Sequence, residues 1–332
     1  MPVSPGSDER PAVSVVEFTD PTVAAQDFEL LAQDAVQLQS NPLHVRRVIV
    51  RLGDATVVQH SANLRVRTRT AAHEGLIAYV TFGPQATGTA NGMPVSPGLL
   101  LAIEPNAQVR FVTDTGWESI AFLLRPEYIG THLADRQRSD EFRMPRGVET
   151  LHASAATVQP LFEWGKRLVD EAAIEPAPFN DSADRRSAAQ VELVETLLAA
   201  LREAADRPPD RGELAKQEQS RIVKIAEDYA LAHVGERLYV SDLCRVTAVS
   251  ERALEYAFKQ TLGLSPVAFL ARLRLHRVRH ALQTQTRGAK TVSAVALDWG
   301  FWHFGEFSRA YKACFGELPS ETLRRHRVDP PR

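Results

Sequence analysis

Nine polar side chains in the last third of this 332-residue chain have the chemistry needed to contact nucleic acid. Lysine and arginine pair with phosphate, an arginine guanidinium can donate two hydrogen bonds to guanine, and a glutamate can accept one from the cytosine amine. The candidates lie in two segments: Arg252, Glu255, Tyr256 and Lys259 in the first, and His303, Glu306, Ser308, Arg309 and Lys312 in the second.

The two segments are copies of one pattern. Five pairs of residues stand 53 positions apart, a spacing that indicates a repeated unit: Leu254/Phe307, Phe258/Tyr311, Lys259/Lys312, Gly263/Gly316 and Pro266/Pro319. A repeated unit with polar side chains at matching places predicts two contact sites for the same kind of partner.

Each copy is typical of a helix, a tight turn and a second helix whose outer face can enter the major groove. We expect helix-turn-helix 1 at about residues 239–260 and helix-turn-helix 2 at about residues 291–313. In the first copy Ser250 is expected to cap the second helix, and in the second copy Gly300 supplies the turn. Ser265-Pro266 begins a helix that extends to about Gln283 and joins the copies.

Apolar residues one turn apart on the second helix of each copy are expected to face inward, as Leu254 and Phe258 do in the first. Four aromatic residues of the second copy are therefore predicted to be core: Trp299, Phe301, Phe307 and Tyr311. Trp302 and Phe304 are left open between core packing and contact with a thymine methyl group.

The doublet resembles the DNA-binding domain of the AraC/XylS family of bacterial transcription regulators, over about residues 221–327. Gly300-Phe301, followed by an aromatic-Ser-Arg stretch ending at Arg309, carries the resemblance. The run from Trp302 to Gly305 departs from the commonest family pattern and is similar to a sub-branch that includes the ethanolamine-operon activator. The resemblance implies a DNA-binding regulator, an activating role with RNA polymerase as a partner, and an N-terminal effector-binding domain with a cupin-like fold.

Charge divides the chain in the same way. Residues 216–327 hold 18 Lys and Arg against 11 Asp and Glu, a net charge of +7, whereas residues 1–215 carry −9. A basic module joined to an acidic one fits a protein that attracts phosphate on one side only. The arginines of the joining helix are left open between solvation and phosphate contact: Arg272, Arg274, Arg277 and Arg279.

The first half has the pattern of an all-β domain. Short apolar stretches separated by turn residues run from His44 to about Pro126, and Asn91-Gly92 is a strong hairpin signal. About eight such segments would close a small barrel or jelly roll that can hold one small ligand. Candidate polar groups for its interior are Arg65, Arg67, Arg69, Tyr79 and Thr81, although alternation does not say which face is inside.

Helical stripes follow the strands, one after Pro160 and one from Ala188 to Leu201, and serve either packing against the barrel or dimerisation. We therefore expect an α+β protein: a cupin-like β-barrel with helices at residues 1–205, a linker at 206–220 around Pro208-Pro209, and an all-α double helix-turn-helix domain at 221–327.

Other function classes find little support in the chain. There is no hydrolase or phosphate-binding motif, and the adjacent pair His73-Glu74 is too sparse for a metal site, so we expect no enzyme, metal or cofactor. Two cysteines, no signal peptide and no apolar run long enough for a bilayer predict a cytoplasmic protein.

The sequence thus predicts a regulator that binds promoter or operator DNA, with an N-terminal domain that senses a small molecule, forms a homodimer, or does both. Two alternatives remain. In one, the N-terminal domain only dimerises or binds a protein; in the weaker one, a cupin-type metalloenzyme is fused to a DNA-binding domain. An enclosed cavity with convergent polar groups would favour sensing over a purely structural role.

Overall fold

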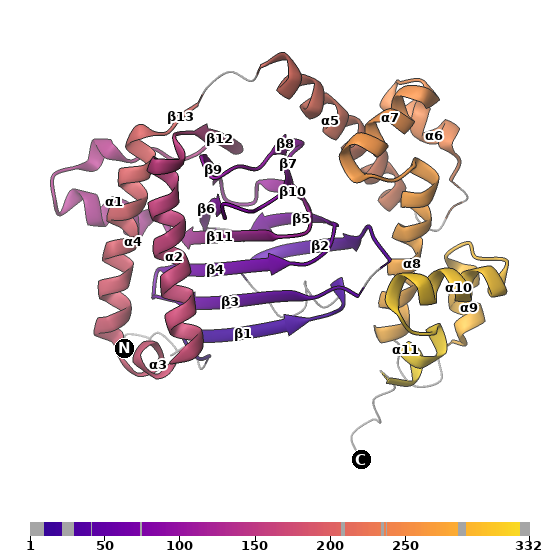
Figure 1. The fold of residues 1–332 in the computed structure, drawn as a ribbon, viewed down its shortest axis with the longest axis horizontal. Helices are drawn as coiled ribbons and strands as arrows, with labels where there is room; N and C mark the ends of the chain where they lie inside the picture. The colour runs from indigo at the N-terminus through magenta and orange to yellow at the C-terminus, as the bar shows by residue number, and fades with distance from the viewer. Residues whose placement is uncertain are drawn as a thin grey trace, which may run out of the picture.

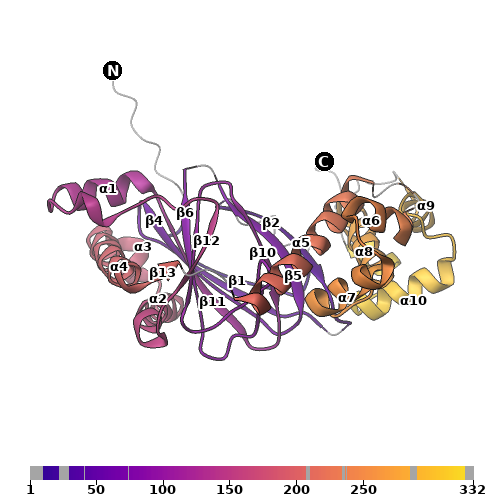
Figure 2. The same ribbon diagram turned by 90° about the horizontal axis from the view of Figure 1, so that it is seen from above.

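The structure, a computed structural model, describes residues 10–21, 30–40, 42–73, 75–206, 210–233, 236, 238–284 and 290–325. Four layers follow one another across the molecule, and Figures 1 and 2 show the same order from two sides. Helices α2 and α4 cover one face of a large sheet, a smaller sheet faces the other side of it, and helices α5 to α11 lie beyond the smaller sheet.

The larger sheet has eight strands in the order β1-β3-β4-β11-β6-β9-β12-β13, and the smaller has five in the order β2-β5-β10-β7-β8. The strands are β1 Val13–Phe18, β2 Leu31–Gln37, β3 Val45–Arg51, β4 Ala55–Ala62, β5 Val66–Ala72, β6 Ile77–Phe82, β7 Gly88–Ala90, β8 Met93–Pro94, β9 Leu99–Ile103, β10 Gln108–Thr113, β11 Trp117–Leu124, β12 Val148–His152 and β13 Ala205–Asp206. The pairings are antiparallel, so one face of each sheet can be apolar while the other carries polar side chains.

The predicted strands between His44 and Pro126 are confirmed, and the hairpin at Asn91-Gly92 joins β7 to β8 with φ of 48° and 84° at the two residues. The cupin-like closed barrel is not confirmed. Among the described residues no strand pairs with both sheets, so they face each other as an open sandwich. The hydrophobic pattern predicted the strands correctly, but closure depends on pairing between strands distant in sequence, which the pattern does not encode.

The helical layer over the larger sheet comprises α1 Pro126–Ala134, the 3-10 helix Ser139–Glu141, α2 Ala155–Ile174, α3 Ala177–Asp181 and α4 Ala183–Glu203. Gly165 lets α2 lie directly on β11, because a Cβ there would come within 2.8 Å of Ile120 and 2.9 Å of Phe122. The stripe Leu193, Val194 and Leu197 on α4 is buried in the same cluster as α2 and the sheet. Packing, rather than an exposed dimerisation face, is therefore what this stripe does.

The remaining helices are α5 Arg211–Ala232, α6 Val240–Thr247, α7 Glu251–Leu262, α8 Pro266–Thr284, α9 Val292–Asp298, α10 Phe304–Phe315 and α11 Pro319–Arg325. The linker was predicted at 206–220, but residues 211–220 are helical and form the start of α5. A capping box begins this helix: Asp210 Oδ1 accepts from the Glu213 amide at 2.8 Å, and Glu213 Oε2 accepts from the Asp210 amide at 2.9 Å. Pro208-Pro209 lies outside the described residues.

Candidate nucleic-acid interface and internal cavity

The first helix-turn-helix unit consists of α6 and α7. The turn between them passes through Ala248, whose φ of 56° is left-handed, and α7 then begins at Ser250. The Ser250 hydroxyl accepts a hydrogen bond from the Ala253 amide at 3.3 Å, so the predicted cap is confirmed. Leu254 and Phe258 are fully buried, and they fix which face of α7 remains outside.

The second unit consists of α9 and α10. Gly300, with φ of 79°, makes the turn, and His303 precedes α10 without a side-chain cap. Phe307 and Tyr311 are buried, and the Tyr311 hydroxyl lies 2.9 Å from the hydroxyl of Thr322 on α11. Trp299 and Phe301 pack partly buried against the same cluster, as predicted, but Trp302 does not belong to it.

The second turn is one residue longer than the first. Left-handed Ala248 and Gly300 are 52 positions apart, as are the amides of Val249 and Phe301, which donate to the carbonyls of Cys244 and Ala296. From the first residue of α7 and α10 onward the separation is 53. The extra residue therefore lies between Phe301 and the start of α10, where Trp302 and His303 stand.

The nine predicted contact residues lie outside the buried core of the two units. Two of them, Glu255 and Ser308, are half-buried. The others are exposed on α7 and α10 or directly before α10: Arg252, Tyr256, Lys259, His303, Glu306, Arg309 and Lys312. Lys259 lies 3.9 Å from Glu255. Within the described parts of the chain, Arg252, Arg309 and Lys312 make no ion pair, so their charge is available to a polyanion.

The joining helix α8 differs from the expectation for its arginines, because two of them contact the first half of the chain. Arg279 is buried, 2.5 Å from Asp20 and 2.9 Å from Glu317. Arg272 donates to the Gln39 carbonyl at 3.2 Å and to the Ser40 hydroxyl at 2.7 Å. Neither solvation nor phosphate contact describes these two arginines.

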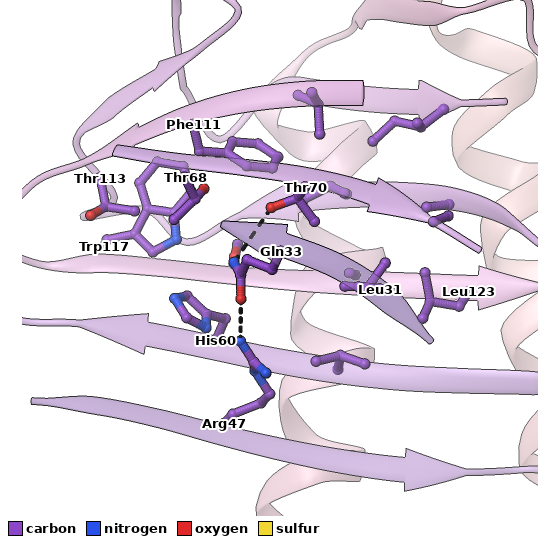
Figure 3. Close-up of a pocket in the computed structure, with 18 residues that line it drawn as sticks. Leu31, Gln33, Arg47, His60, Thr68, Thr70, Phe111, Thr113, Trp117 and Leu123 are labelled. Carbon is purple, nitrogen blue, oxygen red and sulfur yellow. Dashed lines mark hydrogen bonds between the residues drawn. The ribbon is translucent and has the colours of Figure 1, made fainter. Parts of the chain in front are cut away.

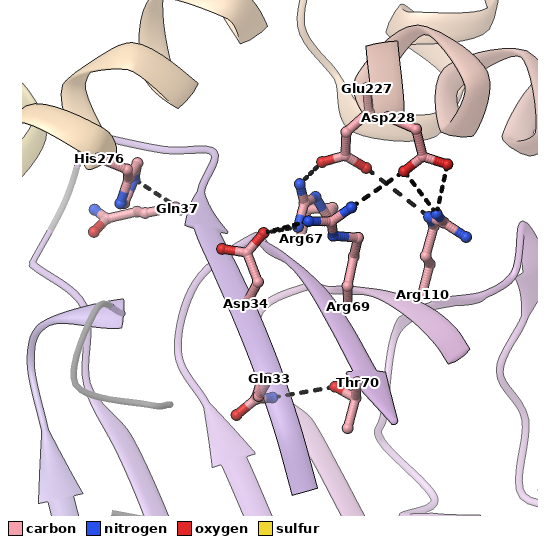
Figure 4. A network of polar contacts seen from close by, with 10 residues as sticks. All are labelled: Gln33, Asp34, Gln37, Arg67, Arg69, Thr70, Arg110, Glu227, Asp228 and His276. Atoms are coloured by element: carbon pink, nitrogen blue, oxygen red, sulfur yellow. Dashed lines mark hydrogen bonds and ion pairs between the residues drawn. The ribbon is translucent and has the colours of Figure 1, made fainter. Parts of the chain in front are cut away.

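A network of ion pairs joins the smaller sheet to α5, and we call Asp34, Arg67, Arg69, Arg110, Glu227 and Asp228 the junction network (Figure 4). Arg67 and Glu227 pair with each other and are 2% and 1% exposed. Arg110 and Arg69 both reach Asp228, at 3.2 and 3.1 Å. Burial lowers the pKa of Arg67 to about 10, which still leaves it charged at neutral pH.

A second polar contact ties α8 to the edge strand β2. The backbone amide of Gln37 donates a hydrogen bond to His276 Nε2 at 3.1 Å, and His276 is 4% exposed. Burial is the main cause that lowers the pKa of His276 to about 3, so the ring is neutral and can accept this hydrogen bond.

The space between the two sheets contains a cavity of about 70 Å³ (Figure 3). Its walls are mostly apolar, with Phe111, Trp117 and Leu123 among them. A polar group lies at one side: Arg47 Nη2 donates to Gln33 Oε1 at 2.6 Å, and Gln33 Nε2 donates to Thr70 Oγ1 at 3.4 Å. His60 also lines the cavity, and burial together with the Arg47 charge lowers its pKa to about 3.

The five polar residues suggested for the interior do not line this cavity. On β5 the cavity side carries Thr68 and Thr70, and the alternate residues Arg67 and Arg69 face α5. Arg65 pairs with Asp114 instead. On β6 the cavity side carries Ala78 and Val80, whereas Tyr79 belongs to the cluster under α2 and α4 and Thr81 bonds the Ile120 carbonyl.

Sequence reasoning missed the residues that join the two halves and those that line the cavity. The partners Arg67 and Glu227 are 160 positions apart, and no local pattern connects them. The capping box at Asp210 and Glu213 was a visible signal that α5 begins there.

The described residues provide no support for a metal site or for a membrane-spanning helix. The described residues contain no group of three or more His, Cys, Asp or Glu placed to hold a metal ion, and Glu74 of the His73-Glu74 pair lies outside them. Among the helices described, none is long and apolar enough to cross a bilayer. Both cysteines are free, and burial raises the pKa of each thiol.

Comparison with known proteins identifies relatives of part of the chain. A family profile described as a helix-turn-helix domain matches residues 243–325. A probable thc operon regulatory protein of Rhodococcus erythropolis is 38% identical over 103 residues, 31% of either chain, and XylDLEGF operon transcriptional activator 2 of Pseudomonas putida is 32% identical over 108 residues, 32% of this chain and 66% of that one. The match thus spans about a third of the first relative's length.

Among solved structures, a probable AraC family transcriptional regulator from Rhodopseudomonas palustris is 36% identical, with a TM-score of 0.31. The alignment covers 32% of this chain and 99% of that one. The residues that the family profile matches, 243–325, hold α7 to α11 and most of α6.

Proposed function

The chain belongs to the AraC/XylS family of transcription regulators, and we propose that it controls transcription by binding specific double-stranded DNA in promoters through both helix-turn-helix units. The observation that carries this proposal is the pair of units with a common inward face and exposed cations, Arg252 and Arg309, that have no acidic partner in the described chain. Activation, with RNA polymerase as a partner, is supported by the relatives named as operon activators.

In this proposal α7 and α10 enter successive major grooves, roughly 34 Å apart along the duplex. Arg252 and Arg309 read guanine, and Glu255 accepts from a cytosine amine. Lys259 and Lys312 contact phosphate, which contributes affinity without sequence information and makes binding sensitive to salt.

Replacing Arg309 separates these roles. We expect Arg309→Ala to weaken binding to a selected site by roughly 10-fold or more, and binding to random DNA far less, because a bidentate guanine contact discriminates by about 1–3 kcal/mol. Gel-shift titrations on both DNAs at one salt concentration measure this. Arg202→Ala, on the far side of the molecule in α4, is the matched control and leaves both affinities unchanged. An equal loss on both DNAs would assign Arg309 to phosphate.

The N-terminal domain is proposed to sense a small molecule in the cavity between the sheets. The mainly apolar walls with one polar side, formed by Arg47, Gln33 and Thr70, suit a small, mostly apolar ligand with a hydrogen-bond acceptor. A filled interior would have favoured the alternative in which this domain has no effector.

Two strands offer a route from the cavity to the DNA-binding half. On β2 the neighbours Gln33 and Asp34, and on β5 the neighbours Thr70 and Arg69, place one side chain at the cavity and the next in the junction network. A ligand that moves these strands therefore also acts on the position of α5. Coupling requires that α5 adopt a second position relative to the sheet and that the ligand bind the two states of the protein with different affinity.

Filling the cavity tests the sensing role. Ala121 lines it from β11, so Ala121→Leu should abolish the rise in melting temperature that a bound small molecule gives, while DNA affinity without ligand is kept. A panel of small carboxylic acids and their amides, screened by thermal shift on the full chain, provides the probes. The sensing role is contradicted if every compound that stabilises the wild type stabilises Ala121→Leu equally, or if none stabilises the wild type. The function would then be DNA binding without an effector.

Homodimerisation through residues 1–205 remains a prediction, now without the α4 stripe as support, because that stripe is buried within the chain. Sedimentation of the full chain at micromolar concentration measures it, and a monomer would remove the idea. We assign no catalytic activity, since the family consists of regulators.

A further inference from the structure

Two aromatic side chains at the start of α10 lie outside the core of their own unit. Trp302 is 71% exposed and Phe304 is 40% exposed, whereas Phe307 in the same helix is 2% exposed. A large apolar side chain left in water gives up the free energy that burial would supply, so the exposure of two aromatics within three residues requires a reason.

The residues at this place in the second unit differ in type from those at the start of α7 in the first unit. The residue before α7 and the first two residues of α7 are polar: Ser250, Glu251 and Arg252. At the start of α10 the longer turn presents Trp302 and His303, and the helix itself begins with Phe304 and Gly305. A Cβ at Gly305 would meet no atom within 4 Å apart from its chain neighbours, so the helix surface at Gly305 is open.

We propose that Trp302 and Phe304 form an apolar reading surface that contacts thymine methyl groups in the major groove; this rests on the proposed function, in which α10 enters that groove. The first residues of a reading helix are the ones that approach base edges. The thymine methyl is the apolar group that the major groove displays, and a phenylalanine ring is a suitable partner for it.

The surroundings of the two rings favour DNA over a protein partner. The exposed charged residues that follow on α10 are Glu306, Arg309 and Lys312, and neither cation has an ion-pair partner in the described chain. A surface that combines apolar rings with unpaired cations matches a groove edge bordered by phosphates. The first unit has no counterpart at this place, so the two units read by different chemistry: polar groups in the first, and apolar contact with Arg309 in the second.

The test replaces thymine by deoxyuridine, which pairs like thymine but lacks the methyl group. Duplexes that the full-length chain selects from random-sequence DNA are remade with deoxyuridine at one thymine at a time. Burial of one methyl group is worth about fourfold in binding, so we expect roughly fourfold weaker binding at one or two positions in the half-site read by α10. Phe304→Ala or Trp302→Ala should bind the thymine duplex more weakly and show no further loss with deoxyuridine.

Two controls keep the outcome specific. Arg309→Ala should retain the sensitivity to deoxyuridine, because it removes a different contact on the same helix, and Ile174→Ala, which changes an exposed apolar residue on α2, should behave as the wild type. The exposed positions of Trp302 and Phe304 make the variants foldable, which circular dichroism melting verifies.

The inference and the proposed function fail in different ways. If no sequence is selected over random DNA, the proposed function fails. If a sequence is selected but the wild type is insensitive to deoxyuridine, or the wild type and both variants lose the same factor, the reading surface is overturned. Unchanged DNA affinity in both variants would likewise overturn it and would reassign the rings to a protein partner.

Discussion

The two helix-turn-helix units share an inward apolar pair and a C-terminal glycine, yet they differ at the start of the second helix and in how they are held. The first unit has a short turn and a serine cap at Ser250, and it packs against α5, whose Glu227 is buried against Arg67. The second has a turn longer by one residue, no side-chain cap at His303, and a tie from α8 through Arg279 to Asp20.

The difference teaches that a sequence repeat preserves the core of a unit more strictly than its outer end. Leu254, Phe258, Phe307 and Tyr311 fill the cores of the two units with large side chains, and the Tyr311 hydroxyl has a buried partner in Thr322. The turn and the first helical residues are limited only by capping and by what they contact, so the two copies can diverge there and serve different contacts.

The largest expected effect concerns the buried ion pair between Arg67 on β5 and Glu227 on α5, the helix against which the first unit packs. Arg67→Met removes the nearer partner of the buried Glu227 carboxylate and leaves it only Arg110, whose Nε lies 3.9 Å away. Breaking a buried pair by removing one partner costs about 3–5 kcal/mol of stability. The urea midpoint measured by tryptophan fluorescence should fall accordingly. Arg245→Met, which breaks an exposed pair with Asp242, should cost at most about 1 kcal/mol. Similar midpoints for the two variants would show that the junction network does not hold the first unit.

The second expected effect is a pH dependence of the free energy of unfolding, caused by the buried His276 on α8. Burial lowers the pKa of His276 to about 3 from an ordinary value of 6.5, so below pH 6.5 the unfolded chain takes up a proton that the folded chain does not. Stability is therefore complete above about pH 6.5 and falls as the pH drops, by about 1.4 kcal/mol per pH unit for this group.

His276→Gln provides the comparison for that slope, because its side-chain oxygen can accept from the Gln37 amide and does not titrate. Urea unfolding between pH 5 and 8 should show the same slope in both proteins above about pH 6.5 and a slope smaller by up to about one proton in the variant below it. His60, whose pKa is also lowered to about 3, contributes equally to both proteins. An identical slope in the two proteins would place the titrating group elsewhere.

The smallest effect compares the residues directly before α7 and α10, Ser250 and His303. Ser250→Ala removes a hydrogen bond to the Ala253 amide and should cost about 1 kcal/mol. His303→Ala removes no side-chain cap and should change stability by less than about 0.5 kcal/mol. Thermal melts of both variants measure the pair. Equal losses would mean that His303 supports α10 by some other contact.

The helices, caps, turns and strands that depend on local periodicity could be predicted from the sequence. The inward pairs, the Ser250 cap, the Gly300 turn and the joining helix were predicted from spacing of 3.6 and from capping chemistry, and the strands of the first half from alternation. All nine candidate contact residues are outside the core, although which of them touch DNA stays a prediction.

What spacing could not decide is which face of an element meets which partner. Alternation on β5 separated Thr68 and Thr70 from Arg67 and Arg69 correctly, but only tertiary packing shows that the threonines face the cavity and the arginines face α5. The same limit applies to α4, whose apolar stripe fits packing and dimerisation equally well until its neighbours are known. Closure of a barrel likewise depends on long-range pairing.

The central claim is that both units bind one DNA molecule in successive major grooves. A hydroxyl-radical footprint of the full-length chain on a duplex that it has selected from random sequence tests this most directly. We predict two protected segments on one face of the duplex, with centres about one helical turn apart. A single protected segment, or equal protection of random DNA, would contradict the account.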